Sequence, residues 1–217
     1  MGLQQQLDAF KAEFVRTGPA GRPALYEAKI EELRATFARE RAIGLNDRAP
    51  DFMLPDQQGR PVSLSELLRA GPAVVTFYRG GWCPYCNIQL RAYQGVLPEM
   101  AALGARLVAV SPQLPDGSLS TAEANNLTFD VLSDVGNHVA CRFGLLWSLP
   151  EELHAALRSN NKALPEINGD DSWKLPVPAT YVIARHGRVV LAAIEVDYRK
   201  RLEPEAILTA LGALRAA

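Results

Sequence analysis

The sequence has 217 residues, a length that suits one domain with an extension or at most two small domains. Hydrophobic residues make up 48%, charged residues 22%, and the net charge is −1, so the composition favours neither nucleic acid nor an anionic membrane as a partner. Three cysteines are too few for a disulfide scaffold. The chain shows no signal-peptide pattern and no apolar run near the ~20 residues of a membrane span, so we expect a cytoplasmic protein.

The N-terminal part of the sequence has a helical pattern. Leu7, Phe10 and Phe14 recur at three- and four-residue steps, and a second stripe of the same kind follows over 30–37. Turn residues separate the two stretches, and Gly44 is placed to end the second helix. We therefore expect residues 1–44 to form a helical extension that packs on the main domain or on a second subunit.

From residue 45 onward, predicted strands alternate with predicted helices. Continuous apolar and β-branched runs predict buried strands, at 73–78, 106–110 and 128–132. Turn residues between extended runs predict two hairpins, at 51–64 and 179–194. Apolar residues at helical spacing predict helices, at 65–68, 84–103, 137–143, 151–158 and 203–216, and a further short helix lies between the strands at 106–110 and 128–132. This order indicates an α/β domain over residues 45–217.

Two of the cysteines stand in the run Trp82-Cys83-Pro84-Tyr85-Cys86, between a predicted buried strand and a predicted helix. Unpaired backbone N–H groups and the helix dipole stabilise a thiolate there, and Cys-x-x-Cys thiols at helix starts have pKa values of roughly 3.5 to 7 against about 8.5 for free cysteine. Pro84 suits the first helical turn. Glycines just before the pair favour an exposed junction. We expect a redox-active pair in which one thiolate attacks and the other thiol resolves.

A zinc half-site is the alternative to a redox pair, but zinc needs two further ligands. Cys141 and three histidines are available, yet the sequence has no second Cys-x-x-Cys and no His-x3–5-His pattern. We therefore expect no metal and no other cofactor. Cys141 lies in a predicted short helix, where an inert core residue is the favoured interpretation. A structural role for Cys83 and Cys86, and a resolving role for Cys141, are the remaining alternatives.

The segment from Phe77 to Cys86, FYRGGWCPYC, resembles the active-site segment of the peroxiredoxin-like branch of the alkyl hydroperoxide reductase/thiol-specific antioxidant family. The resemblance covers about residues 45–205 and includes four shorter matches, at Ala49-Pro50-Asp51-Phe52, Val110-Ser111-Pro112, Leu132-Ser133-Asp134 and Asp197-Tyr198-Arg199-Lys200-Arg201. It implies a thioredoxin-like fold: a central mixed sheet flanked by helices, with an N-terminal β-hairpin. It also implies an antioxidant oxidoreductase that reduces hydroperoxides or disulfides through Cys83 and Cys86. A thioredoxin- or glutathione-type donor would recycle it.

The sequence departs from the peroxiredoxin pattern at three places. Cys86 takes the position of the peroxide-attacking cysteine, but Cys83 stands where those enzymes have Thr and Arg79 where they have Pro. Pro178 stands where they have an Arg before the strand that faces the site, and thioredoxins carry a cis-proline there. Pro178 is either such a cis-proline or an ordinary strand-initiating proline, and we favour the first interpretation. In peroxiredoxins the Thr hydroxyl and the Arg hold the peroxide and polarise its O–O bond. Loss of one such donor commonly lowers the rate around a hundredfold.

These departures keep several functions open. A thiol–disulfide oxidoreductase without physiological peroxidase activity and a redox-sensing binding module are the alternatives to a peroxidase. The thioredoxin analogy makes Cys83 the attacker, whereas the peroxiredoxin analogy makes Cys86 the attacker. A homodimer and a monomer with a helical flap both fit the N-terminal extension.

Three neighbours of the pair are candidate supporting residues, each with a plainer interpretation. Arg79 either lowers a thiol pKa or is solvated or paired with a carboxylate. Trp82 could shield the disulfide or contact a partner, and its plainer interpretation is packing in the core. Tyr85 either presents an exposed ring to a substrate or packs on the helix.

Overall fold

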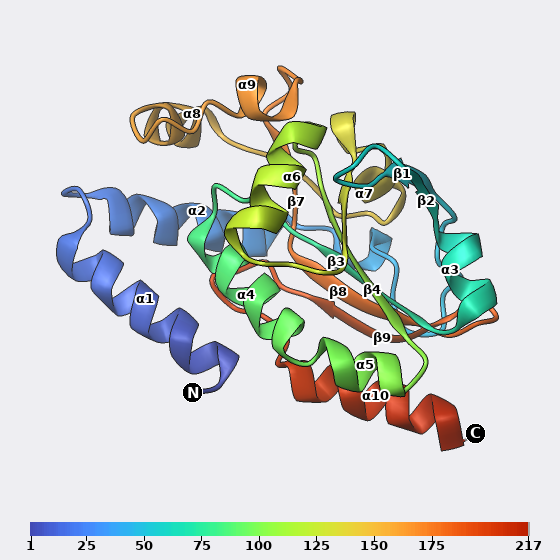
Figure 1. Ribbon diagram of the computed structural model, residues 1–217. Helices are drawn as coiled ribbons and strands as arrows, with labels where there is room; N and C mark the ends of the chain where they lie inside the picture. Colours follow the sequence, from blue (N-terminus) through green and yellow to red (C-terminus); the bar gives the residue numbers. More distant parts are fainter. Residues whose placement is uncertain (217) are drawn as a thin grey trace.

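The protein is described by a computed structural model over residues 1–216, with a five-stranded mixed sheet at its centre (Figure 1). The strand order is β5-β4-β3-β8-β9. The strands are β3 (Ala73–Phe77), β4 (Arg106–Ser111), β5 (Asp130–Ser133), β8 (Ala179–Ile183) and β9 (Val189–Ile194). Strands β3, β4 and β5 run parallel, whereas β8 is antiparallel to both β3 and β9. The sequence-based prediction of a central mixed sheet flanked by helices is confirmed.

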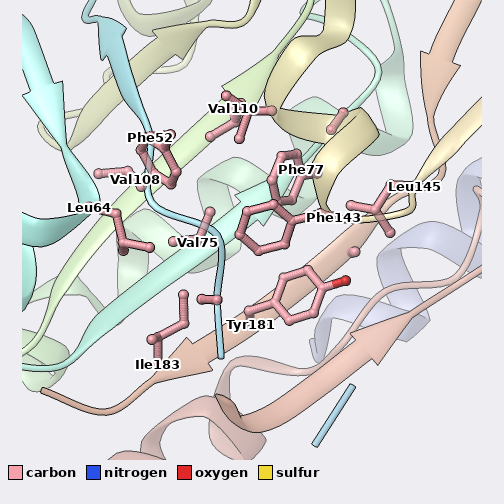
Figure 2. Close-up of a cluster of buried hydrophobic side chains, with 14 of the residues drawn as sticks. Phe52, Leu64, Val75, Phe77, Val108, Val110, Phe143, Leu145, Tyr181 and Ile183 are labelled. Atoms are coloured by element: carbon pink, nitrogen blue, oxygen red, sulfur yellow. The ribbon is translucent and has the colours of Figure 1, made fainter. Parts of the chain in front are cut away.

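Side chains of β3 alternate between two hydrophobic cores, as successive Cβ atoms of a strand must. Val75 and Phe77 belong to the first core, which Figure 2 shows, whereas Val74 belongs to the second. The first core lies under α3 (Leu64–Ala70) and α7 (His138–Arg142). The second lies under α4 (Pro84–Gly95), α5 (Leu97–Ala102) and α10 (Pro204–Ala216). Because both faces of the central strands are covered, their sequences are continuously apolar.

The single helix predicted over 84–103 is divided into α4 and α5. Helix α4 ends at Gly95, and α5 begins at Leu97 with Pro98 in its first turn. Proline has no N–H to continue the helical hydrogen bonds of α4, so the chain starts a new helix there. Within residues 1–216, no helix is long and apolar enough to span a membrane.

The N-terminal extension contains α1 (Leu3–Thr17), α2 (Arg22–Thr36) and a 3-10 turn, Arg39–Arg41. Figure 1 shows α1 lying along α4, and Leu3 and Leu7 of α1 are buried in the second core. The Glu203 carboxylate accepts hydrogen bonds from the first N–H groups of α1. Gly44 does not cap α2, because α2 ends at Thr36 and the 3-10 turn intervenes.

The remaining elements surround the sheet. A predicted hairpin is formed by β1 (Met53–Pro55) and β2 (Pro61–Ser63), and predicted helices are α6 (Pro115–Ala124) and α8 (Glu151–Arg158). Three elements have no counterpart in the sequence-based prediction: α9 (Leu164–Asn168), β6 (Leu146–Ser148) and β7 (Lys174–Pro176). A short 3-10 turn, Val135–Asn137, precedes α7. Strands β6 and β7 pair antiparallel and hold the irregular segment that contains α8 and α9.

Candidate redox site

The cysteine pair lies where the chain leaves β3 and enters α4. Cys83 is the N-cap of α4, and its carbonyl accepts hydrogen bonds from the N–H groups of Cys86 (3.0 Å) and Asn87 (3.1 Å). Pro84 is the first helical residue, as expected. Both cysteines are free thiols. Cys83 therefore sits at the positive end of the α4 dipole, which favours a thiolate there.

The expected exposed junction is wrong, because both thiols are buried. Cys83 is 2% exposed and Cys86 is fully enclosed. Helix α1 covers the start of α4, and the Phe10 ring lies edge-on to Tyr85 with centroids 5.0 Å apart. The helical pattern of the sequence predicts the extension but not the surface that the extension covers.

The two glycines before the pair allow the loop to pass close to α6. Gly80 has φ of +138°, a conformation that residues with a Cβ rarely adopt, and an added Cβ on Gly81 would overlap the Thr121 hydroxyl. The Gly81 N–H donates to the Gln113 side chain, and its carbonyl accepts from Asn87 Nδ2 at 2.8 Å. These contacts fix the loop that carries the cysteines.

Arg79 lies in this loop and is buried between two aromatic rings. Its guanidinium carbon is 4.8 Å from the ring centre of Trp82 and 4.1 Å from that of Tyr198. Only 7% of the residue is exposed, and Nε has no hydrogen-bond partner among residues 1–216. The solvated and carboxylate-paired interpretations of Arg79 therefore do not hold, and its charge lies beside the thiols.

Arg201 brings a second guanidinium to the pair from the segment after β9. Its Nη2 donates to Cys86 Sγ at 3.5 Å, and its Nε donates to Gln89 Oε1 at 2.7 Å. Gln89 in turn donates to the Thr76 hydroxyl at 3.2 Å, which holds its amide oxygen toward Arg201. The side chain is buried, so this guanidinium is fixed against the sulfur rather than dispersed in solvent.

The pKa values of the two thiols are shifted in opposite directions. Burial acts to raise the pKa of Cys83, but the hydrogen bond from Cys86 and the charges of Arg79 and Arg201 lower that pKa well below the usual value. Burial and the neighbouring Cys83 thiolate raise the pKa of Cys86 well above the usual value. These opposite shifts favour the thiolate at Cys83 and the thiol at Cys86, and Arg201 donates to the Cys86 sulfur.

Pro178 does not have the predicted cis peptide bond, since every peptide bond within residues 1–216 is trans. The chain is extended through this point: the Val177 N–H donates to the Leu145 carbonyl, and the Pro178 carbonyl accepts from the Glu195 N–H at 2.9 Å. A trans bond keeps both hydrogen bonds in line with the strands. Pro178 lines a cavity of about 290 Å³ together with Gln89 and Arg201.

A second cavity, of about 220 Å³, opens onto Cys83. Its walls come from α1, α2, the cysteine loop, the end of α8 and the segment after β9. The residues that matter for its chemistry are Phe14, Tyr26, Arg79, Trp82, Cys83 and Lys162. Cys86 is not among the lining residues, so of the two thiols it is Cys83 that faces this space.

Three of the predicted supporting residues, Arg79, Trp82 and Tyr85, line this cavity. Tyr85 is 5% exposed and packs against Phe10 and Tyr198, so its predicted exposed ring is wrong and its packing interpretation holds. Trp82 is half-buried, and Arg79 and Lys162 approach its ring. Trp82 therefore forms part of the cavity wall.

An ion-pair cluster ties the cavity wall to the body of the domain. Arg199 donates to Asp197 Oδ1 at 2.7 Å and to Glu27 Oε2 of α2 at 2.6 Å. The hydrogen bond from Arg199 lowers the pKa of Glu27, so Glu27 stays ionised. The N-terminal extension is thereby held over the redox site by charge as well as by packing.

Cys141 is exposed, which corrects its expected place in the core. Helix α7 buries Val139 and Ala140, and Cys141 falls on its outer side. Among residues 1–216, no three His, Cys, Asp or Glu side chains lie together as a metal-binding group.

Two functional candidates were missed by sequence reasoning. Arg201 lies in the run Asp197 to Arg201, which carried part of the family resemblance but no assigned role. Lys162 lies in an irregular segment, and its place in the cavity depends on how that segment folds back onto Trp82. No local pattern in the sequence pointed to either contact.

Comparisons with known proteins agree with this fold. The model of the AhpC/TSA family matches residues 45–192. A chloroplastic peroxiredoxin Q of Sedum lineare is 31% identical over 156 residues, which are 72% of this chain and 69% of that protein. A putative peroxiredoxin of Mycobacterium tuberculosis is 28% identical over 169 residues, 78% of this chain and 96% of that protein.

Solved structures show the same scaffold. The crystal structure of peroxidoxin BcpB from Mycobacterium tuberculosis superimposes with a TM-score of 0.62 at 25% identity and covers 79% of this chain and 97% of that one. The fold and the buried dithiol define a thioredoxin-like protein of the peroxiredoxin class. The chain belongs to the AhpC/TSA family.

Proposed function

We propose that the protein is a thiol-dependent peroxidase that reduces a hydroperoxide at Cys83 and then forms a Cys83–Cys86 disulfide. The observation that carries this proposal is the position of Cys83, which lines a cavity together with Arg79, while the charges of Arg79 and Arg201 lower its pKa. Membership of the AhpC/TSA family and the peroxiredoxin names of its relatives support a hydroperoxide as the substrate.

The chemistry needs no group beyond the dithiol. The Cys83 thiolate attacks the terminal peroxide oxygen, the O–O bond breaks, and the alkoxide takes a proton from water and leaves as an alcohol. Cys83 is then a sulfenic acid. The Cys86 thiol attacks its sulfur, water leaves, and the disulfide forms. The guanidinium of Arg79, which lines the same cavity as Cys83, stabilises the negative charge that develops on the leaving oxygen.

Cys83 is proposed as the attacking residue on grounds of access and charge. It faces the cavity and has the lowered pKa, whereas Cys86 is enclosed and has the raised pKa. The peroxiredoxin resemblance alone had placed Cys86 in that role. Arg201 supplies a guanidinium that the proline at position 178 cannot, so the site keeps an electrostatic element that the sequence comparison had counted as missing.

The surroundings complete the proposal. We propose that residues 1–44 act as an extension of the domain that walls the cavity, and that a thiol donor returns the disulfide to the dithiol. Because both cysteines must be reduced again after each turnover, we propose a reducing cytoplasm as the location.

The test is a single-turnover measurement of peroxide consumption by the pre-reduced protein. We expect one peroxide consumed per cysteine pair, at least about a hundredfold faster than by a free thiol at pH 7. Cys83→Ser should abolish the reaction, Cys86→Ser should keep it but stop at the sulfenic acid, and Cys141→Ser is the matched control. Consumption no faster than by a free thiol would contradict the peroxidase proposal. If Cys86→Ser lost the reaction while Cys83→Ser kept it, the result would contradict the roles of Cys83 as the attacking and Cys86 as the resolving cysteine.

A further inference from the structure

The cavity next to Cys83 contains two cations without a carboxylate partner. Within residues 1–216, neither Arg79 nor Lys162 takes part in a salt bridge, and the buried Nε of Arg79 has no hydrogen bond. The other cations of the cavity are compensated, since Arg199 pairs with Glu27 at 2.6 Å and Lys11 lies 3.9 Å from the same carboxylate. The uncompensated positive charge is therefore concentrated on the Cys83 side of the cavity.

In the reduced protein, the Cys83 thiolate is the counter-charge for both cations. Its charge acts to raise the pKa of Arg79 and of Lys162, while burial and the charge of Arg79 lower the pKa of Lys162. Formation of the disulfide removes this negative charge. Two cations then face the cavity without a counter-ion, so the cavity binds an anion more strongly in the disulfide state than in the dithiol state.

The route to Cys83 suits a small molecule. The residue is 2% exposed, and α1, α2 and the end of α8 surround the opening. A cavity of about 220 Å³ holds many water molecules, each of which needs roughly 10–15 Å³ by this measure. Phe14 and Tyr26, stacked with ring centres 5.9 Å apart, add apolar surface to the wall of the cavity.

We infer that this cavity binds the reductant of the protein, and that the reductant is a low-molecular-weight thiol that carries a carboxylate. This inference rests on the proposed function and names its electron donor. The donor thiolate attacks Cys83 Sγ, and the Cys83–Cys86 bond breaks. The Cys86 sulfur leaves and takes a proton. A second donor thiolate attacks the donor sulfur of the mixed disulfide, which releases the oxidised donor and restores the Cys83 thiolate.

Three thiols of the same size but different charge test this inference: 3-mercaptopropionate (anionic), 2-mercaptoethanol (neutral) and cysteamine (cationic). The protein is first oxidised to the Cys83–Cys86 disulfide with diamide, and the rate of its reduction is measured with each thiol. Each rate is divided by the rate of the same thiol with a small neutral disulfide, which removes the difference in intrinsic reactivity. We expect 3-mercaptopropionate to exceed cysteamine by about tenfold in wild type, less so in high salt.

Three variants locate the selectivity. Lys162→Gln should lower the ratio to well below the wild-type value, with the charge of Arg79 still present, and Lys162→Arg should restore it. Lys11→Gln is the matched control, because Lys11 lines the same cavity but lies close to Glu27, and its ratio should stay at the wild-type value. Circular dichroism of each oxidised variant checks that it is folded.

Two outcomes would overturn the inference: a ratio near one in the wild-type protein, or a wild-type ratio retained in folded Lys162→Gln. Because diamide supplies the oxidation, the measurement does not depend on peroxide. A protein that reduces peroxide but shows no charge selectivity refutes only this inference. A protein that shows charge selectivity among the thiols but does not consume peroxide refutes only the proposed peroxidase function.

Discussion

Replacement of Arg201 by Met should raise the pKa of the reactive thiol. The guanidinium of Arg201 donates to Cys86 Sγ at 3.5 Å and lowers the pKa of both thiols by its charge. Because the hydrogen bond is made to Cys86, Arg201 acts on Cys83 by its charge, and a nearby opposite charge commonly shifts a pKa by about 1–3 units. We therefore expect an increase of about one to two units, which lowers the thiolate fraction at a pH below both values by about ten- to a hundredfold.

The assay is the rate of alkylation of Cys83 by iodoacetamide between pH 5 and pH 10, read by mass spectrometry of the Cys83 peptide. Only the thiolate reacts, so the rate rises with pH through the pKa. In wild type the midpoint should lie below that of free cysteine. Arg201→Met should move it upward, and Arg201→Lys, which keeps the charge without the planar fork, should give an intermediate value.

Arg39→Met is the matched control, because Arg39 lines the cavity that contains Arg201 but donates only to the Ile194 carbonyl. Gln89→Leu is a second probe, since it removes the acceptor that orients Arg201 while the charge stays. It should shift the midpoint less than Arg201→Met does. An unchanged midpoint in folded Arg201→Met would refute the role given to this residue.

Three further predictions concern the surroundings of the pair. Gly81→Ala should cost about 1–3 kcal/mol in free energy of unfolding, measured by urea denaturation, because its Cβ meets Thr121; a cost below 0.5 kcal/mol would contradict the tight approach. Glu27→Gln should lower the free energy of unfolding by less than about 1 kcal/mol, since Glu27 is half exposed, but it should speed amide hydrogen exchange in α2 because the ion pair with Arg199 is lost. Unchanged exchange would argue against a role of this ion pair. Cys141→Ser should remove the thiol labelled first by a maleimide in the native protein and leave peroxide consumption unchanged; slow labelling of Cys141 would contradict its exposure.

The sheet was predictable because its signal is local. The run at 73–77 consists of apolar and β-branched residues, which is typical of a strand covered on both faces, and the helix after Pro84 has a clear apolar stripe. Strands β6 and β7 were missed because each has three residues, too few to show a period of two. Their pairing is fixed by contacts between residues about 30 positions apart.

The candidate site was predictable only in part. The spacing of Cys83 and Cys86 and the helix that follows them predict a redox pair. The burial of the pair was not predictable, because it depends on where α1 packs, and a helical stripe does not name the surface that it covers. Arg201 is more than a hundred residues from Cys86 in the sequence, so only the folded chain shows that it donates to that sulfur.

The most direct test of the account is the identification of the first cysteine to be oxidised. One equivalent of hydroperoxide is added to the reduced protein in the presence of dimedone, and the products are read by mass spectrometry of the peptides. The account predicts a Cys83–Cys86 disulfide in wild type and a dimedone adduct on Cys83 in Cys86→Ser. A dimedone adduct on Cys86 in Cys83→Ser, formed as fast as the wild-type disulfide, would contradict it.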